Sequence, residues 1–221
     1  MPTLQHLLFD LDGTLLDTVP DILSAMNKVL AQNNLPPVNL DTLRHRIHGG
    51  SQALLGKAFG ITEHDPKYGS IKEQFLKEYS ITLNVQTNYF TGIPELLTAL
   101  KKAQIPWGIV TNKPTWLTQP LLTHFPLLAQ AHCIICGDTL SVQKPNPEPV
   151  LLALQQGKFP SENTVFLGDS EIDMIAGQKA GVMTAIAAYG YIPKHEDVTQ
   201  WPHHFIIQQP HDLLAILGKS L

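Results

Sequence analysis

The segment HLLFDLDGTLLDT, residues 6–18, decides the fold. A short apolar run leads directly into Asp10, Leu11 and Asp12, and Gly13 then turns the chain. Side chains alternate between the two faces of a strand, so Asp10 and Asp12 are predicted to point to the same side. Two carboxylates so close repel each other, and one pKa rises unless a cation or a shared proton intervenes. The pattern indicates either an ordinary strand that ends in an Asp-Gly turn or a site that handles charge.

Composition limits the classes of function. A chain of 221 residues with 43% hydrophobic residues can form one domain, or one domain with a small insert. The net charge of -4 gives no electrostatic reason to expect nucleic acid as a partner. The first apolar run is interrupted by Asp10, and no apolar segment is long enough to span a bilayer. We therefore expect a cytoplasmic protein with neither a nucleic-acid nor a membrane partner.

The two cysteines form a C-x-x-C pattern, Cys133 and Cys136, which raises the question of redox or zinc chemistry. Their surroundings, HCIICGD, read as a buried strand, and a separation of three places the thiols on opposite faces. No second cysteine pair is present to complete a zinc site with four ligands. The pair is predicted to be structural.

Short apolar runs alternate with segments of helical periodicity along most of the chain. Alternating strands and helices are typical of a doubly wound, mostly parallel sheet with helices on both sides, which is an α/β fold. The predicted strands are residues 6–10, 107–111, 132–137, 164–169, 184–189 and 203–207.

One region breaks this alternation, because no convincing strand occurs between residues 17 and 88. Apolar residues from Val19 to Leu30 follow one helical face, and Thr18 with Asp21 resembles a capping box at the start of that helix. Further helices are expected around 40–48, 51–59 and 68–82. The sequence thus predicts a core of residues 1–16 and 89–221 and a helical insert of residues 17–88.

Polar side chains follow four of the predicted strands. The carboxyl ends of parallel strands meet at one edge of the sheet, where ligands bind, so we expect these groups to converge. They are Asp10 and Asp12 after the first strand, Thr111, Asn112 and Lys113 after the second, Lys144 in QKPNPEP after the third, and Asp169, Ser170 and Asp173 in GDSEID after the fourth.

Each of these residues alone has an ordinary explanation as a turn, cap or surface residue; for instance, Ser170 and Asp173 can cap the helix that follows them. Together they form a chemical set. Carboxylate oxygens suit Mg²⁺, which prefers hard oxygen ligands. A hydroxyl, a lysine and backbone N–H groups suit phosphoryl oxygens. The set therefore predicts a magnesium site that handles a phosphate ester.

At these residues the sequence resembles the haloacid dehalogenase superfamily of phosphatases. FDLDGTLLD is similar to the first motif of that family, IVTN to the second, Lys144 in QKPNPEP to the third, and GDSEID to the fourth. The resemblance covers essentially the whole chain and implies a Rossmann-like core, with residues 17–88 as a helical cap of the C1 type. Within the superfamily, VTNKP and KPNPEP look most like phosphoglycolate phosphatases. HGGSQALL and YGYI are similar to N-acetylmuramic acid 6-phosphate phosphatases.

The resemblance also implies roles for the residues that match its motifs. Asp10 would be the nucleophile that forms an aspartyl-phosphate, and Asp12 would protonate the leaving oxygen and later deprotonate water. Mg²⁺ would be held by the side chains of Asp10 and Asp169 and by the backbone carbonyl of Asp12. The remaining assignments are Thr111, Asn112 and Lys144 to the phosphoryl group, and Asp173 and Ser170 to supporting positions, where Asp173 would orient Lys144 or a metal-bound water.

The cap would exclude water from the site and select the leaving group. Its candidate substrate contacts are Arg46, His48, Gly49, Gly50 and Ser51, because paired glycines before a helix let backbone N–H groups approach an anion. A plain turn between helices is the alternative explanation for the glycines. A small phosphorylated acid, bound by a monomer or a homodimer, is the expected substrate.

Other functions fit parts of the pattern. A phospho-receiver regulator also combines acidic residues with a threonine and a lysine on such a sheet, although it needs no helical insert. A dehalogenase would need neither Asp12 nor Mg²⁺. A β-phosphoglucomutase shares the four motifs and differs in transferring the phosphoryl group to a sugar instead of to water.

Overall fold

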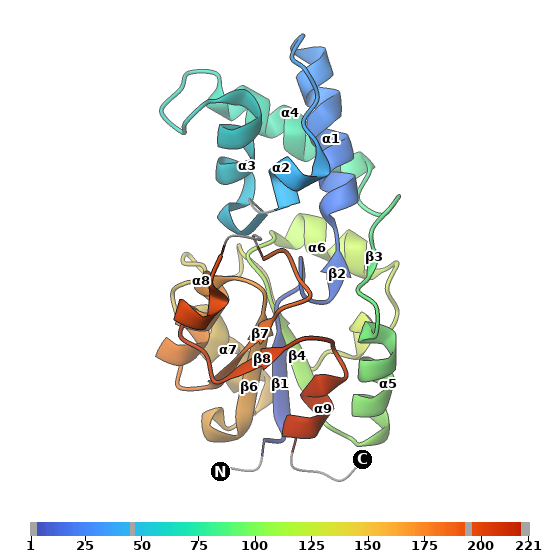
Figure 1. Cartoon of the computed structure of the whole chain (residues 1–221), viewed down its shortest axis with the longest axis vertical. Helices are drawn as coiled ribbons and strands as arrows, with labels where there is room; N and C mark the ends of the chain where they lie inside the picture. The colour runs from blue at the N-terminus through green and yellow to red at the C-terminus, as the bar shows by residue number, and fades with distance from the viewer. Residues whose placement is uncertain (1–3, 45–46, 193–195, 218–221) are drawn as a thin grey trace. The chain divides into compact units, whose positions relative to one another are not determined.

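A computed structural model describes residues 4–44, 47–192 and 196–217 (Figure 1). The chain divides into two compact units, one made of Met1–Leu16 and Tyr89–Leu221 and the other of Asp17–Asn88. The first unit contains the large sheet, and the second is helical apart from its two ends. We refer to them as the core unit and the helical unit.

The core unit is built on a six-stranded sheet in the order β5-β4-β1-β6-β7-β8, in which every pair of neighbours is parallel. The predicted α/β fold with a mostly parallel sheet is confirmed. The chain fills one side of β1 first and then returns to the other side, which makes the end of β1 a topological switch point. The strands are β1 (His6–Phe9), β4 (Trp107–Val110), β5 (Ile134–Ile135), β6 (Thr164–Gly168), β7 (Met183–Ala187) and β8 (Phe205–Ile207).

Helices cover both faces of this sheet, with α7 and α8 on one face and α5 and α9 on the other (Figure 1). Pro94 lies in the first turn of α5, where its missing N–H costs no hydrogen bond. The helices of the core unit are α5 (Ile93–Lys102), α6 (Thr115–Leu122), α7 (Glu148–Gly157), α8 (Glu171–Lys179) and α9 (Asp212–Ile216), with short 3₁₀ turns η2 (Leu128–Gln130), η3 (Ser161–Asn163) and η4 (Val198–Gln200).

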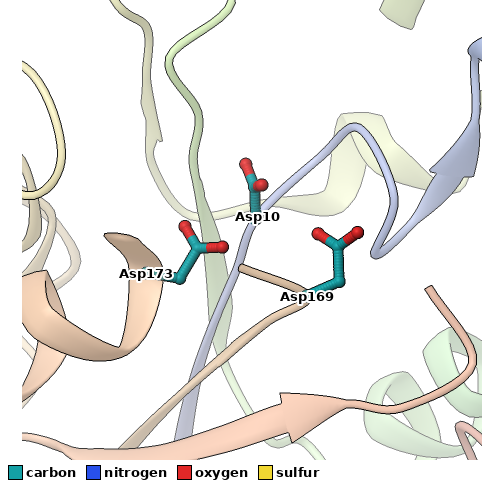
Figure 2. A group of neighbouring side chains, drawn as sticks. All are labelled: Asp10, Asp169 and Asp173. Carbon is teal, nitrogen blue, oxygen red and sulfur yellow. The ribbon is translucent and has the colours of Figure 1, made fainter. Parts of the chain in front are cut away.

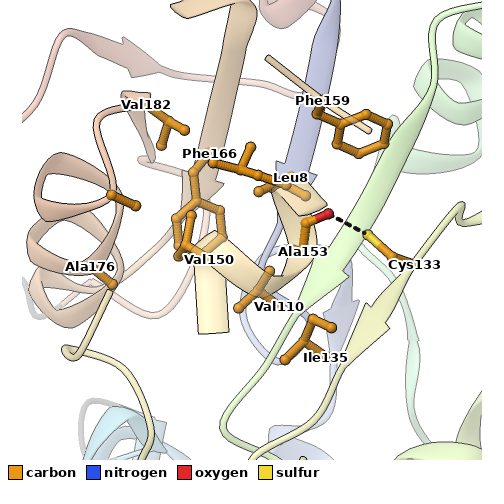
Figure 3. Close-up of a cluster of buried hydrophobic side chains, with 12 residues drawn as sticks. Leu8, Val110, Cys133, Ile135, Val150, Ala153, Phe159, Phe166, Ala176 and Val182 are labelled. Carbon is orange, nitrogen blue, oxygen red and sulfur yellow. Dashed lines mark hydrogen bonds between the residues drawn. The ribbon is translucent and has the colours of Figure 1, made fainter. Parts of the chain in front are cut away.

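The core between the sheet and α7 and α8 is formed by side chains from all of these elements (Figure 3). Leu8 of β1, Val110 of β4 and Phe166 of β6 are fully buried there. Their strands contribute alternate residues to this face, as the strand period requires. The apolar packing anchors the strands whose carboxyl ends carry the polar residues.

The predicted strand 132–137 is shorter than expected, because only Ile134 and Ile135 pair with β4. Cys133 and Cys136 flank this pair as free, buried thiols. The Cys133 thiol donates to the carbonyl of Ala153 at 3.4 Å (Figure 3), and burial raises its pKa to about 11. Both thiols are thus part of the packed interior.

The helical unit contains α1 (Val19–Gln32), α2 (Leu40–Arg44), η1 (Ile47–Gly49), α3 (Gly50–Phe59) and α4 (Tyr68–Ile81). One apolar face of α1 is buried, as its periodicity predicts. The predicted capping box of Thr18 and Asp21 is wrong, because Thr18 makes no side-chain cap. Asp21 instead accepts hydrogen bonds from the backbone N–H groups of Val85, Gln86 and Thr87 at 3.1, 2.9 and 2.9 Å.

The chain passes between the two units at residues 16–17 and 88–89. The sequence predicts no strand at either place. The structure has a short strand at each, β2 (Leu16–Asp17) and β3 (Asn88–Tyr89), and the two strands pair. Two residues are too short a run for periodicity to show.

None of the helices in the described part of the chain combines the length and the hydropathy of a membrane-spanning segment.

Candidate active site

Three buried carboxylates lie together at the carboxyl edge of the sheet. Oxygen atoms of Asp10, Asp169 and Asp173 all lie within 4.8 Å of one another (Figure 2). Asp10 follows β1 and Asp169 follows β6, while Asp173 lies in the first turn of α8. The register of β1 against β6 is continued by a hydrogen bond from the Asp10 N–H to the carbonyl of Leu167 at 2.9 Å. Parallel pairing thus places three acids from two parts of the sequence at one point.

A buried lysine bridges two of these acids. The Nζ atom of Lys144 lies 2.8 Å from Asp10 Oδ1 and 2.7 Å from Asp173 Oδ1, and it donates to the carbonyl of Val110 at 2.8 Å. The ammonium group thus makes two ion pairs with carboxylates and one hydrogen bond with a backbone carbonyl. Although burial alone would lower the pKa of Lys144, the two carboxylates raise it above its ordinary value. Lys144 therefore stays charged.

The crowding of acids shows in Asp10. Burial raises the pKa of Asp10 well above its ordinary value, and the carboxylates of Asp173 and Asp169 add to the rise against the opposing effect of Lys144. One lysine does not compensate three carboxylates in a buried place. A further cation at this point would favour the charged form of Asp10.

Asp169 is held by groups that the motifs did not suggest. Its Oδ1 accepts a hydrogen bond from the Thr14 hydroxyl at 3.3 Å, and its Oδ2 accepts one from the Tyr191 N–H at 2.8 Å. Gly13 and Gly190 pack against it so closely that an added Cβ would lie 2.1 Å from Asp169 Oδ2 or 2.4 Å from Asp169 Cβ. Gly13 has a φ of +94°, which also favours glycine. Residues that follow β1 and residues that follow β7 thus hold Asp169 together.

Asp173 is occupied on both oxygens. Its Oδ2 accepts from the Ser170 N–H at 3.2 Å and from the Ser170 hydroxyl, while its Oδ1 faces Lys144. The bonds to Ser170 belong to a capping box at the start of α8. Asp173 therefore links the helix cap to Lys144.

Asp12 lies apart from the three-acid cluster and pairs with a different lysine. Lys113 Nζ donates to Asp12 Oδ1 at 3.1 Å, with Oδ2 at 3.5 Å. The side chain of Lys113 is 5% exposed and that of Asp12 is 16% exposed. Lys113 stands at the end of a predicted strand, and the sequence indicates no role for it. No local pattern reveals this pair, because its members are 101 residues apart.

Thr111 and Asn112 follow β4 at the same edge. The Thr111 hydroxyl oxygen accepts a hydrogen bond from the Lys113 N–H at 3.1 Å, which leaves its own O–H to donate. The Asn112 side chain donates to the Lys144 carbonyl at 3.0 Å and accepts from the Lys144 N–H at 3.1 Å. Asn112 thus positions the backbone of Lys144. This role is not predicted by the sequence, which places Asn112 among the groups that bind the phosphoryl group.

The substrate contacts predicted in the insert lie in the helical unit. Arg46 is outside the described residues. His48 and Gly49 belong to η1, and Gly50 and Ser51 begin α3. Gly50 has a φ of +59°, and a Cβ on Gly49 would lie 2.3 Å from the Cβ of Ala53. The turn itself therefore requires both glycines, which supports the plain-turn explanation for their presence.

Comparisons with known proteins agree with this geometry. The family model described as haloacid dehalogenase-like hydrolase matches residues 7–187. An N-acetylmuramic acid 6-phosphate phosphatase of Pseudomonas aeruginosa is 35% identical over 99% of this chain and 96% of its own length. A phosphoglycolate phosphatase of Xanthomonas campestris pv. campestris is 37% identical over 95% of this chain and 94% of its own length.

A solved structure extends the likeness to three dimensions. The crystal structure of a predicted phosphoglycolate phosphatase from Haemophilus somnus superimposes with a TM-score of 0.87 at 28% identity, covering 98% of this chain and 99% of the other. The family model and the relatives span the segments that carry Asp10, Thr111, Lys144 and Asp169. With the parallel sheet and the buried acids at its edge, they lead to one conclusion: the chain belongs to the haloacid dehalogenase-like hydrolase family and is a phosphatase.

Proposed function

We propose that this phosphatase hydrolyses a small phosphorylated acid through an aspartyl-phosphate on Asp10, with Mg²⁺ as its cofactor. The observation that carries the proposal is the buried cluster of Asp10, Asp169 and Asp173, with Lys144 bridging Asp10 and Asp173. Because the chain belongs to a hydrolase family, the phospho-receiver alternative is set aside.

Asp10 is the nucleophile in this proposal. A carboxylate oxygen of Asp10 attacks phosphorus, the bond from phosphorus to the ester oxygen breaks, and the electron pair of that bond leaves with the alcohol oxygen. Water then attacks the phosphorus of the aspartyl-phosphate, which releases inorganic phosphate and restores the Asp10 carboxylate. Lys144 lies 2.8 Å from Asp10 Oδ1 and provides positive charge beside the group being transferred.

The donor set of the site fits magnesium. Asp10 and Asp169 offer buried carboxylate oxygens, which are hard ligands of the kind Mg²⁺ prefers. We propose these two side chains and the Asp12 carbonyl as its ligands, whereas Asp173, which bonds to Ser170 and lies 2.7 Å from Lys144 Nζ, supports Lys144. When bound, the ion would neutralise charge among the acids and on the phosphoryl group.

Asp12 is the acid and base of the proposed cycle. It gives a proton to the leaving alcohol oxygen in the first step and takes one from the attacking water in the second, so it ends each turnover unchanged. The Thr111 hydroxyl donates a hydrogen bond to a phosphoryl oxygen during both steps. Between the first step, which leaves Asp12 as a carboxylate, and the second, the ion pair with Lys113 holds that carboxylate in place.

The helical unit acts as the cap and selects the leaving group. The core residues contact only the phosphoryl group and the ester oxygen, so discrimination among esters must come from groups around the leaving portion. The two relatives named above are a phosphoglycolate phosphatase and an N-acetylmuramic acid 6-phosphate phosphatase, and both names describe substrates with a carboxylate. A cytoplasmic location and a monomeric or homodimeric state stay predictions from the sequence.

A substrate panel tests this proposal. Phosphate release would be measured for 2-phosphoglycolate, N-acetylmuramic acid 6-phosphate, glucose 6-phosphate, p-nitrophenyl phosphate and a nucleoside monophosphate. One of the two carboxylate-bearing esters should lead in kcat/KM by at least tenfold, or about 1.4 kcal/mol of transition-state binding. Excess chelator should remove the activity, Mg²⁺ should restore it, and Ca²⁺ should substitute poorly because it accepts looser geometry.

Three results would contradict the proposal. A nucleotide or a carboxylate-free ester that leads by tenfold would refute the substrate class. Full activity in excess chelator would refute the metal. Transfer of the phosphoryl group to an added sugar, in place of release to water, would identify a mutase instead.

A further inference from the structure

We infer that Tyr189 is a positioning residue of the magnesium site, because its hydroxyl holds the turn of residues 11–16, and this turn orients two of the three proposed ligands. We call this segment the Asp12 turn. The two ligands are the Asp12 carbonyl and the Asp169 side chain. The inference rests on the proposed function, since it takes these groups as ligands. It assigns a role to the loop after β7, which lies outside the four motifs.

The Asp12 turn connects both ligands. It is closed by a hydrogen bond from the Gly13 N–H to the Leu16 carbonyl at 2.9 Å. The turn contains the Asp12 carbonyl, and its Thr14 hydroxyl donates to Asp169 Oδ1 at 3.3 Å. A shift of this turn would therefore move the Asp12 carbonyl and the donor to Asp169 together.

Tyr189 holds the Asp12 turn from the loop that follows β7. Its hydroxyl donates to the Thr14 carbonyl at 3.1 Å, and Thr14 is fully buried, so solvent does not supply another donor there. The ring of Phe90 packs against the Tyr189 ring, with centroids 5.5 Å apart. Burial raises the pKa of Tyr189 above its ordinary value, and the charge of Asp169 adds to the rise, so the phenol keeps its proton and donates.

The loop that carries Tyr189 is itself fixed. The Ala188 N–H donates to the carbonyl of Ile207 in β8 at 2.9 Å, which extends the pairing of β7 with β8. A Cβ on Gly190 would lie 2.4 Å from the carbonyl oxygen of Gly13, so the loop and the Asp12 turn are in close backbone contact. Tyr189 thus reaches the turn from a rigid base, as a positioning group must.

Magnesium makes such positioning consequential. Mg²⁺ demands near-ideal octahedral geometry, so small displacements of its ligands weaken binding. Groups that orient metal ligands typically contribute about 10- to 100-fold to metal affinity. The Thr14 hydroxyl contacts Asp169 directly, whereas Tyr189 acts one bond further away, on the Thr14 carbonyl. We therefore expect the Tyr189 hydroxyl to contribute about tenfold, the lower end of this range.

The test measures Mg²⁺ binding itself, by isothermal titration calorimetry on the folded protein without substrate. Tyr189→Phe deletes the hydroxyl, keeps the ring and should weaken Mg²⁺ binding about tenfold. Mg²⁺ should also raise the thermal unfolding midpoint less in this variant than in the parent, because a weaker ligand stabilises the native state less. Circular dichroism checks that both proteins are folded.

Tyr89→Phe is the matched control, since it deletes the same atom from another tyrosine of the core unit. The Tyr89 hydroxyl is buried, and its ring packs edge-on against Phe125 with centroids 4.9 Å apart. This variant should keep its Mg²⁺ affinity within about twofold of the parent. Equal losses of Mg²⁺ affinity in the two phenylalanine variants would indicate a general structural effect and overturn the inference.

Variants of Thr14 test the route from Tyr189 to Asp169. Thr14→Val removes the hydroxyl and should weaken Mg²⁺ binding about 10- to 100-fold, whereas Thr14→Ser retains it and should keep most of the affinity. In the double variant of Thr14→Val with Tyr189→Phe, the loss should be smaller than the product of the two single losses, because both act on Asp169.

Several results would overturn this route. Single losses that multiply in the double variant would show that Tyr189 and Thr14 act independently. An unchanged Mg²⁺ affinity in Thr14→Val would exclude the route even if Tyr189→Phe did not fold.

The titration also separates the inference from the proposed function. A parent protein that binds Mg²⁺, with Tyr189→Phe binding it equally well, would refute the inference and leave the proposed function intact. A parent protein that binds no Mg²⁺ would count against the metal of the proposed function, and the inference would fall with it.

Discussion

Both units contain buried carboxylate groups, but the groups that surround these carboxylates differ between the units. In the helical unit, Asp21 is fully buried and accepts four hydrogen bonds, from three successive backbone N–H groups and from the Thr87 hydroxyl at 2.7 Å. In the core unit, Asp10, Asp169 and Asp173 lie within 4.8 Å of one another, and the lysine Lys144 bridges two of them, Asp10 and Asp173.

The difference separates a structural acid from a functional site. Asp21 receives neutral donors that belong to one short segment, so its charge is satisfied and the segment is tied to α1. The core acids are left with mutual repulsion, and the pKa of Asp10 rises because burial and its acidic neighbours outweigh Lys144. Unrelieved repulsion in a buried place is typical of a site that awaits a cation or a reacting group.

The largest effect is expected at the buried acids of the core unit. Asp10→Asn should reduce turnover of p-nitrophenyl phosphate by at least about 10⁴-fold, because an amide is a poor nucleophile and a weaker metal ligand. The thermal unfolding midpoint should stay the same or rise, since one repelling carboxylate is removed and Lys144 keeps its contact with Asp173. Phosphate release and circular dichroism would measure the two quantities. Near-native turnover would show that the cluster is not the reacting centre.

An effect of intermediate size is expected at the buried acid of the helical unit. Asp21→Ala would leave three backbone N–H groups and one hydroxyl without their acceptor, so the free energy of unfolding should fall by about 2–4 kcal/mol. Turnover per folded molecule should change by less than about threefold. Denaturant unfolding would measure the loss. Asp41→Ala, at an exposed position of α2, is the matched control and should stay within about 0.5 kcal/mol of the parent.

If Asp21→Ala abolished turnover without loss of stability, the distinction between a structural and a functional acid would not hold.

The smallest effect concerns a buried group with no charged partner. Burial raises the pKa of the Cys133 thiol from 9.0 to about 11, so the native state favours the neutral thiol. The contribution of this thiol to the free energy of unfolding is fully present below pH 9 and is lost as the pH rises toward 11. By pH 9.5 the free energy of unfolding has fallen by about 1 kcal/mol on this account. Cys133→Ala should show a correspondingly flatter decline of the free energy of unfolding between pH 8 and 9.5.

Cys133 sharpens the comparison because its raised pKa arises from burial alone. In the native protein its thiol should react with iodoacetamide far more slowly than in the unfolded chain at pH 8. Rapid native-state alkylation would contradict the burial on which the prediction rests. At Asp10, by contrast, two acidic neighbours add to the effect of burial on the pKa.

Much of the core unit follows from the sequence because its signals are local. Alternating apolar strands and helical periods identify a parallel sheet, and polar residues at strand ends must then meet at one edge. Asp10, Lys144 and Asp169 could be assigned to one place on this ground alone. The boundary strands β2 and β3 were missed because two residues carry no recognisable period.

Contacts between distant segments could not be read in the same way. The pairing of Lys113 with Asp12 and the hydrogen bond from the Tyr191 N–H to Asp169 join residues 101 and 22 positions apart. Neither pair has a sequence pattern of its own. Each depends on loops that the completed sheet brings together.

Two occurrences of one short sequence pattern show what the sequence determines and what depends on the tertiary structure. Thr18 with Asp21 and Ser170 with Asp173 both place a hydroxyl three residues before an acid at the start of a helix. At α8 the acid bonds back to Ser170, and the local capping box forms. At α1 Asp21 instead accepts hydrogen bonds from the backbone N–H groups of residues 85–87, which lie 64 to 66 positions further along the chain. Sequence determines that an acid at this spacing can cap a helix, and only the folded chain determines whether a better set of donors lies beside it.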